Sequence, residues 1–203
     1  MERKHPISRY DRQASFDSRF DDQRRSTQLL RDAWVNWIQR SNLSSPFFLT
    51  GHYWRPHTLQ EASRTNQRFL KILNKDLFGR AGRIRGKKPP AIQVTRFPTI
   101  EKNPLQGDTE SHHSHIILDV PYGFDPGEFR NKLVSAWYKA NGGDCDVDVR
   151  AVLSPDDLAR CAGYTAKGRQ KDFFSFDEFF DAQNVWLETK KFVKEASGSS
   201  HPL

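Results

Sequence analysis

The sequence predicts an α+β fold in which helices pack against an antiparallel sheet. Four short segments have the apolar content and flanking turn residues of β-strands. Apolar residues recur at helical spacing between the first and second of these segments and between the third and fourth. The resulting order is β-α-β-β-α-β, with further helical segments at both ends of the chain.

The N-terminal part contains a polar arm, a helix and the first strand. Residues 1–25 are charged and poor in apolar residues, which predicts a disordered basic arm. Apolar residues in 26–44 recur every three or four positions and predict a helix that packs on the core. The apolar run in 45–54 predicts a buried strand, and Thr58 with Glu61 forms a capping box for the helix that follows.

The central strands are predicted at 91–101 and 112–121, and the polar, glycine-containing segment between them indicates a hairpin. A further strand is predicted at 145–153, and a last helix should end near residue 196, before a disordered tail at 197–203. Three helix starts are marked by an N-cap residue followed by proline or glutamate. They are Asp125 with Pro126, Ser154 with Pro155, and Ser175 with Glu178.

These elements predict one domain over residues 45–196, preceded by the helix at 26–44. Their order matches a ferredoxin-like arrangement, in which helices cover one face of the antiparallel sheet. The other face is then expected to be free for a site, with Phe97 as one of its few aromatic residues.

The chain is basic, with a net charge of +7 and a pI near 9.5, which favours a polyanionic partner. A loop without any acidic residue concentrates this charge and is expected to track phosphates. Its cations are Arg80, Arg83, Arg85, Lys87 and Lys88.

The two cysteines form neither a disulfide framework nor a four-cysteine zinc site. Since no apolar run suits a bilayer or a signal peptide, we expect a soluble, cytoplasmic protein without a membrane partner.

His113 and His115 stand at the start of a predicted strand, where residues two apart point to the same face. Both imidazoles could therefore bind one metal ion. Glu101 ends the preceding strand with the parity that faces away from the core, so it is the expected third ligand. Two alternatives remain: a solvated strand end without a ligand, and a zinc site formed by His112, His113 and a cysteine.

Tyr164 and Lys167 lie on the helix that begins after Ser154, on the side that also carries Lys171. Positive charge favours the phenolate, and a lysine can hold a phosphate or assist its leaving group. The alternative is an ordinary amphipathic surface tyrosine beside solvated lysines.

Three segments in order resemble the motifs of HUH endonucleases of the rolling-circle replication initiator type. They are FFLTGHYW, HSHIIL and GYTAKG, within residues 45–170. The resemblance implies that His113, His115 and Glu101 bind Mg²⁺ or Mn²⁺. It also implies that Tyr164 is the nucleophile with Lys167 as its helper. Leu49 and Thr50 would support the site or contact DNA.

The implied activity is site-specific nicking and joining of single-stranded DNA through a 5′-phosphotyrosine, which starts rolling-circle replication of a plasmid or phage. The DNA would be a single strand or an origin hairpin. Because no nucleotide-binding loop is present, a host helicase and polymerase would be needed. The alternatives are a single-tyrosine transposase, a mobilisation relaxase, and a non-catalytic module that binds single-stranded nucleic acid.

Neutralising Arg83, Arg85, Lys87 and Lys88 together should weaken DNA binding and flatten its dependence on salt. With fewer phosphates contacted, binding releases fewer counterions from the DNA. Fluorescence anisotropy at several salt concentrations measures both effects. An unchanged slope would place the DNA path elsewhere.

Overall fold

The computed structural model describes residues 25–26, 28–55, 57–83, 92–103, 111–143, 145–166, 181 and 184–186. Within them the chain has the predicted α+β class. Residues 28–40 form an N-terminal helix. The strands are β1 (Pro46–His52), β2 (Arg96–Asn103), β3 (Ser111–Asp119) and β4 (Val147–Ala151), and the further helices are α2 (Leu59–Phe78), α3 (Pro126–Asn141) and α4 (Pro155–Thr165).

The described strands form one antiparallel sheet in the order β2-β3-β1-β4. β2 and β3 pair directly, which confirms the predicted hairpin partners. β3 lies between β2 and β1 and therefore forms hydrogen bonds along both of its edges. This position fixes which of its side chains point to each face.

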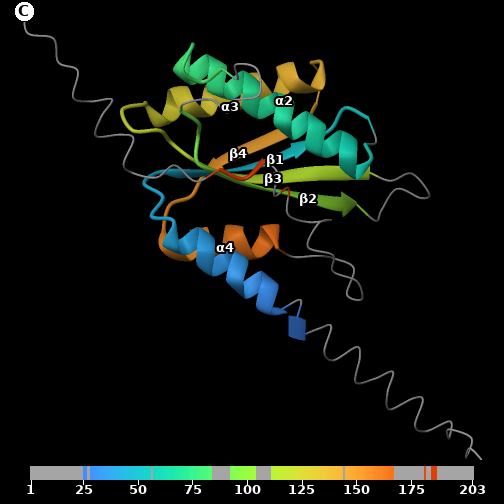
Figure 1. Cartoon of the computed structure of the whole chain (residues 1–203), viewed down its shortest axis with the longest axis vertical. Coiled ribbons are helices and arrows are strands. Elements are labelled where there is room, and N and C mark those ends of the chain that lie inside the picture. Colours follow the sequence, from blue (N-terminus) through green and yellow to red (C-terminus); the bar gives the residue numbers. More distant parts are fainter. Residues whose placement is uncertain are drawn as a thin grey trace, which may run out of the picture.

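Helices α2 and α3 cover one face of the sheet, and the N-terminal helix and α4 lie on the other (Figure 1). The first layer buries Leu118 and Phe129 in a cluster around Trp137. The predicted helix ends are confirmed there: Thr58 and Glu61 exchange the hydrogen bonds of a capping box, and Asp125 caps α3. Ile116, Leu118 and Val120, which alternate along the chain from β3 onward, all belong to this cluster.

The expectation of a free second face was wrong over much of the sheet. Phe48, Phe97 and Ile117 form an apolar surface there, which Trp34 and Ile38 of the N-terminal helix cover. The Phe97 ring is fully buried, with its centroid 5.2 Å from that of Trp37. Both faces of the sheet carry a cluster of apolar side chains, so each cluster needs its own layer of helices.

The predicted helix at 175–196 lies mostly outside the described residues. At Trp186 the prediction was wrong, because this residue is not helical. This residue forms an isolated antiparallel bridge with Arg96, in which the Arg96 N–H donates to the Trp186 carbonyl at 2.7 Å. The outer edge of β2 offers unpaired backbone groups, and pairing with this segment satisfies them. The predicted disordered segments, including 197–203 and all of 1–25 except Arg25, lie outside the described residues.

Gly51 in β1 lies directly against the Trp137 indole, which occupies the space of a Cβ atom. Gly51→Ala should therefore destabilise the fold by about 1–3 kcal/mol through overpacking. Thermal unfolding measures this loss.

Gly163 in α4 is the matched control, because a Cβ there meets only Arg31 at 3.8 Å. Gly163→Ala should leave stability unchanged or raise it by up to about 1 kcal/mol, as helix propensity dictates. Equal effects of the two substitutions would contradict the packing argument.

Candidate active site

The register of β2 and β3 places three candidate metal ligands together. Glu101 lies directly opposite His113, and His115 follows two residues later on β3. Since side chains alternate along a strand, all three project from the same face. This is the face that the N-terminal helix and α4 partly cover.

The three side chains converge on one point. Glu101 Oε2 lies 3.1 Å from His113 Nε2 and 3.1 Å from His115 Nε2. One potential ligand atom from each residue lies within 4.8 Å of the others. Metal–ligand bonds of about 2.0–2.2 Å need donor atoms about 3 Å apart, so the group could hold a divalent ion.

Thr50 on β1 fixes the orientation of one imidazole. Its Oγ1 lies 3.1 Å from His115 Nδ1. With the proton on Nδ1 and donated to Thr50, the lone pair of Nε2 points to the Glu101 side and can bind a cation.

The charge states also suit a cation. Burial alone would raise the pKa of Glu101, but hydrogen bonds and charge from His113 and His115 outweigh it and lower this pKa to about 2. Burial lowers the pKa of His115, although Glu101 opposes that shift. An ionised carboxylate beside a neutral imidazole is the state that metal ligands require.

Helix α4 brings Tyr164 to this group. Ser154 caps the helix, and Leu158 and Cys161 on its inward side are buried. The Tyr164 ring meets His115 edge-on at a centroid distance of 5.0 Å, and its side chain is 45% exposed. A tyrosine open to solvent thus lies against one of the candidate ligands.

A cavity of about 650 Å³ opens beside Tyr164. Its walls come from two strands and α4, and they carry two guanidinium groups. The lining residues are Phe48, Thr50, Arg150, Asp157, Arg160, Cys161 and Tyr164. No local sequence pattern marks Arg150 as a site residue, because its partner Asp157 belongs to another element and no spacing rule connects the two.

Two of the predicted phosphate-contacting residues lie away from this cavity. Arg80 and Arg83 are exposed at the end of α2, on the layer across the sheet from Glu101. Lys167 and Lys171, as well as Arg85, Lys87 and Lys88, lie outside the described residues.

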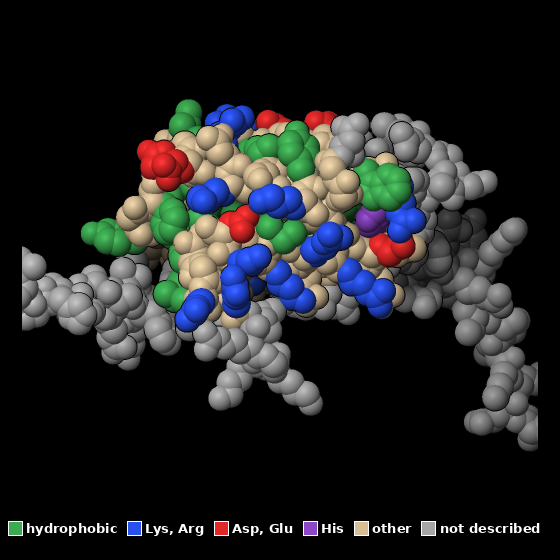
Figure 2. Space-filling view, turned by 90° about the horizontal axis from the view of Figure 1, so that it is seen from above, with side chains coloured by type: hydrophobic (Ala, Val, Ile, Leu, Met, Phe, Trp, Pro, Cys, Tyr) green, Lys and Arg blue, Asp and Glu red, His purple; other side chains and the backbone are tan. Residues whose placement is uncertain are grey.

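The α2 and α3 layer carries many basic side chains (Figure 2). Along α2 they form a row at helical spacing, which could have been recognised from the sequence. The row consists of the exposed residues Arg64, Arg68, Lys71 and Lys75.

The alternative zinc site with His112 and His113 is not formed. His112 Nδ1 donates a hydrogen bond to the His57 carbonyl at 2.6 Å. Neighbouring residues on β3 point to opposite faces, so His112 faces away from His113. Among the described residues, the only group of three that could hold a metal ion is Glu101, His113 and His115.

Comparison of the chain with models of protein families, with curated proteins and with solved structures gives no significant match. In the part of the chain that the structure describes, no helix has both the length and the apolar character to cross a bilayer.

Glu101→Gln should weaken Mn²⁺ binding most, because it removes the negative charge at the centre of the group. Thr50→Val removes only the hydrogen-bond partner of His115 Nδ1, and it should lower the affinity for Mn²⁺ by about 10- to 100-fold. Titration calorimetry measures both. Glu128→Gln removes an exposed carboxylate from α3 and is the control; if it weakened binding as much as Glu101→Gln, the assigned site would be wrong.

Proposed function

We propose that this protein is a site-specific single-strand DNA endonuclease and strand transferase that uses Tyr164 as its nucleophile. The observation that carries the proposal is the contact between the exposed Tyr164 ring and His115, which belongs to a Glu/His/His group. A tyrosine beside a site of this composition suits attack on a phosphodiester. Glu101, His113 and His115 would hold Mg²⁺ or Mn²⁺, which when bound would polarise a phosphate oxygen.

The reaction is balanced without water or a nucleotide. The Tyr164 phenolic oxygen forms a bond to phosphorus, and the bond from phosphorus to the 3′-oxygen of the neighbouring nucleotide breaks. The phenol loses its proton and the leaving oxygen gains one, so the products are a 5′-phosphotyrosine and a free 3′-hydroxyl. Attack by a 3′-hydroxyl on the tyrosyl phosphate reverses the step and joins strands.

The sheet order supports the assignment of a ferredoxin-like fold. From the β4 edge the strands follow as β4-β1-β3-β2, with α2 between β1 and β2 and α3 between β3 and β4. Antiparallel neighbours in this order are expected of a ferredoxin-like sheet. The proposal therefore includes this fold, with the N-terminal helix and α4 added to its second face.

The proposed role is initiation of rolling-circle replication of a plasmid or phage in the cytoplasm, with host helicase and polymerase as partners. A single-tyrosine transposase or relaxase would use the same chemistry on a different DNA. A non-catalytic module that stacks bases on the sheet is less favoured, because Phe97 is buried under Trp34 and Trp37.

A pool of single-stranded DNA incubated with the protein and Mn²⁺ should give a covalent adduct that survives a denaturing gel. Tyr164→Phe should abolish the adduct because the ring can no longer attack phosphorus, while leaving DNA binding within about twofold. Sequencing of the attached strand would identify the cleavage site.

Tyr138→Phe is the control, because this exposed tyrosine lies on α3, across the sheet. If the adduct persists in Tyr164→Phe, the assignment of Tyr164 as the nucleophile is wrong. Firm DNA binding with no adduct from a diverse pool would instead favour the binding module.

A further inference from the structure

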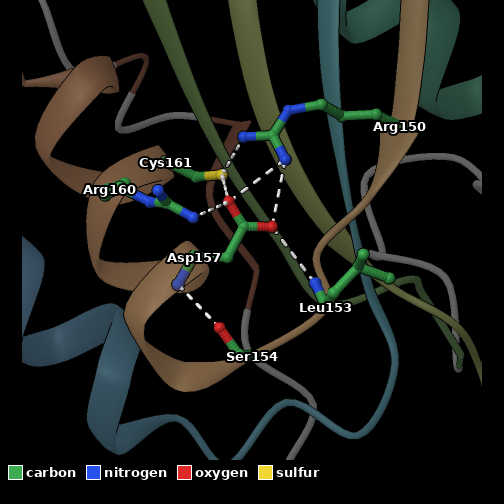
Figure 3. Close-up of polar contacts among 6 residues, drawn as sticks. All are labelled: Arg150, Leu153, Ser154, Asp157, Arg160 and Cys161. Atoms are coloured by element: carbon green, nitrogen blue, oxygen red, sulfur yellow. Dashed lines mark hydrogen bonds and ion pairs between the residues drawn. The ribbon is translucent and has the colours of Figure 1, made fainter.

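The cavity beside Tyr164 contains a charged group that the proposed nicking step does not use. Arg150 projects from β4, and Asp157 and Arg160 from α4, so that two guanidinium groups meet one carboxylate (Figure 3). All three residues line the cavity. The local charge is therefore net positive.

Asp157 holds this group in place. Its carboxylate accepts hydrogen bonds from Arg150 Nη1 at 3.0 and 3.2 Å and from the Leu153 N–H at 3.1 Å. Its own backbone N–H donates to Ser154 Oγ at the start of α4. The hydrogen bond from Arg150, followed by that from Leu153, lowers the pKa of Asp157. The carboxylate is thus a fixed anion at neutral pH.

The Arg150 guanidinium is oriented but not saturated. One nitrogen donates to Asp157 and another lies 2.9 Å from Cys161 Sγ, while the group sits 5.4 Å over the Phe48 ring. A guanidinium has five N–H donors, and the Arg150 side chain is 44% exposed. Donors therefore remain for a ligand in the cavity.

Arg160 adds a second cation that is almost fully available. It lies 3.5 Å from Asp157, and its side chain is 78% exposed. Two guanidinium groups with spare donors suit a ligand with several negative oxygens, and phosphate has that chemistry.

Arg150 and Arg160 lie close to the candidate metal ligands. Phe48 on β1 is paired with Arg150 on β4, and its ring stacks on His115 of β3 at 5.5 Å. β3 and β4 flank β1, so they are about 10 Å apart. A DNA strand with one phosphate at His115 would bring a neighbouring phosphate within reach of Arg150.

We propose that Arg150 and Arg160 bind a backbone phosphate of single-stranded DNA next to the phosphate that Tyr164 attacks, with Asp157 as the residue that positions Arg150. The placement relative to Tyr164 rests on the proposed function. Binding of a phosphate in this cavity can be tested without it. A purely structural ion pair that fastens α4 to β4 is the competing explanation.

The test is fluorescence anisotropy of a short labelled oligothymidylate with the full chain, at several salt concentrations and with a chelator present. Arg150→Gln should reduce the slope of log affinity against log salt by about 0.7, the contribution of one single-strand phosphate contact. Arg68→Gln makes the same charge change on the exposed side of α2 and should leave the slope unchanged. Arg150→Lys keeps the charge and should retain most of the slope.

A structural ion pair would lower the melting temperature of Arg150→Gln and leave the slope unchanged, which would overturn the proposal. An equal slope change in Arg68→Gln would also overturn it. If Arg150→Gln does not fold, the exposed Arg160→Gln decides the matter: a flatter slope supports the phosphate site and an unchanged slope rejects it.

The two proposals can fail separately. A Tyr164-dependent adduct together with an unchanged Arg150→Gln slope would keep the nicking function and reject the phosphate site. A flatter slope without any adduct would keep the phosphate site on a protein that binds single strands without cutting them.

Discussion

The register of β3 between its two neighbours is the constraint on which the rest of the structure depends. Side chains alternate along a strand, so a shift of one residue would exchange its two faces. In the observed register His115 lies opposite Thr50 on one side and Thr99 on the other. The same register sends Ile116 and Leu118 into the α2 and α3 layer. The same register therefore determines both how the core packs and how the candidate site is assembled.

Ser114 lies between the two histidines and shows how this register tolerates a polar residue in the core. Its side chain is fully buried, and its hydroxyl pairs with Tyr53 at 2.5 Å and with Asn66 at 2.9 Å. A buried hydroxyl costs little when it is hydrogen-bonded. The strand can therefore carry a polar residue between the two histidines while one of its faces stays packed against α2.

The sequence was sufficient where local rules apply. The caps at Thr58, Asp125 and Ser154, the hairpin strands, and the parity of Glu101 with the histidines all follow from spacing along the chain. It was insufficient where the outcome depends on contacts between distant elements. Phe97 was expected at an open face because nothing local shows that the N-terminal helix covers it. The ion pair of Arg150 with Asp157 depends likewise on how α4 packs on β4.

Asp181 and residues 184–186 extend the folding unit beyond the end of α4. Asp181 accepts hydrogen bonds from Ser63 and Asn66 of α2, and Arg96 donates to the Asn184 carbonyl at 2.7 Å. Burial lowers the pKa of Arg96 to about 10, so the guanidinium is charged at neutral pH and needs these partners. Although α4 ends at Thr165, a chain cut shortly after it would lack the acceptors that pair with Ser63 and Asn66 of α2 and with Arg96 of β2. On a ribosome, the domain therefore becomes complete only when synthesis has passed Trp186, well after the residues of the candidate site have been made.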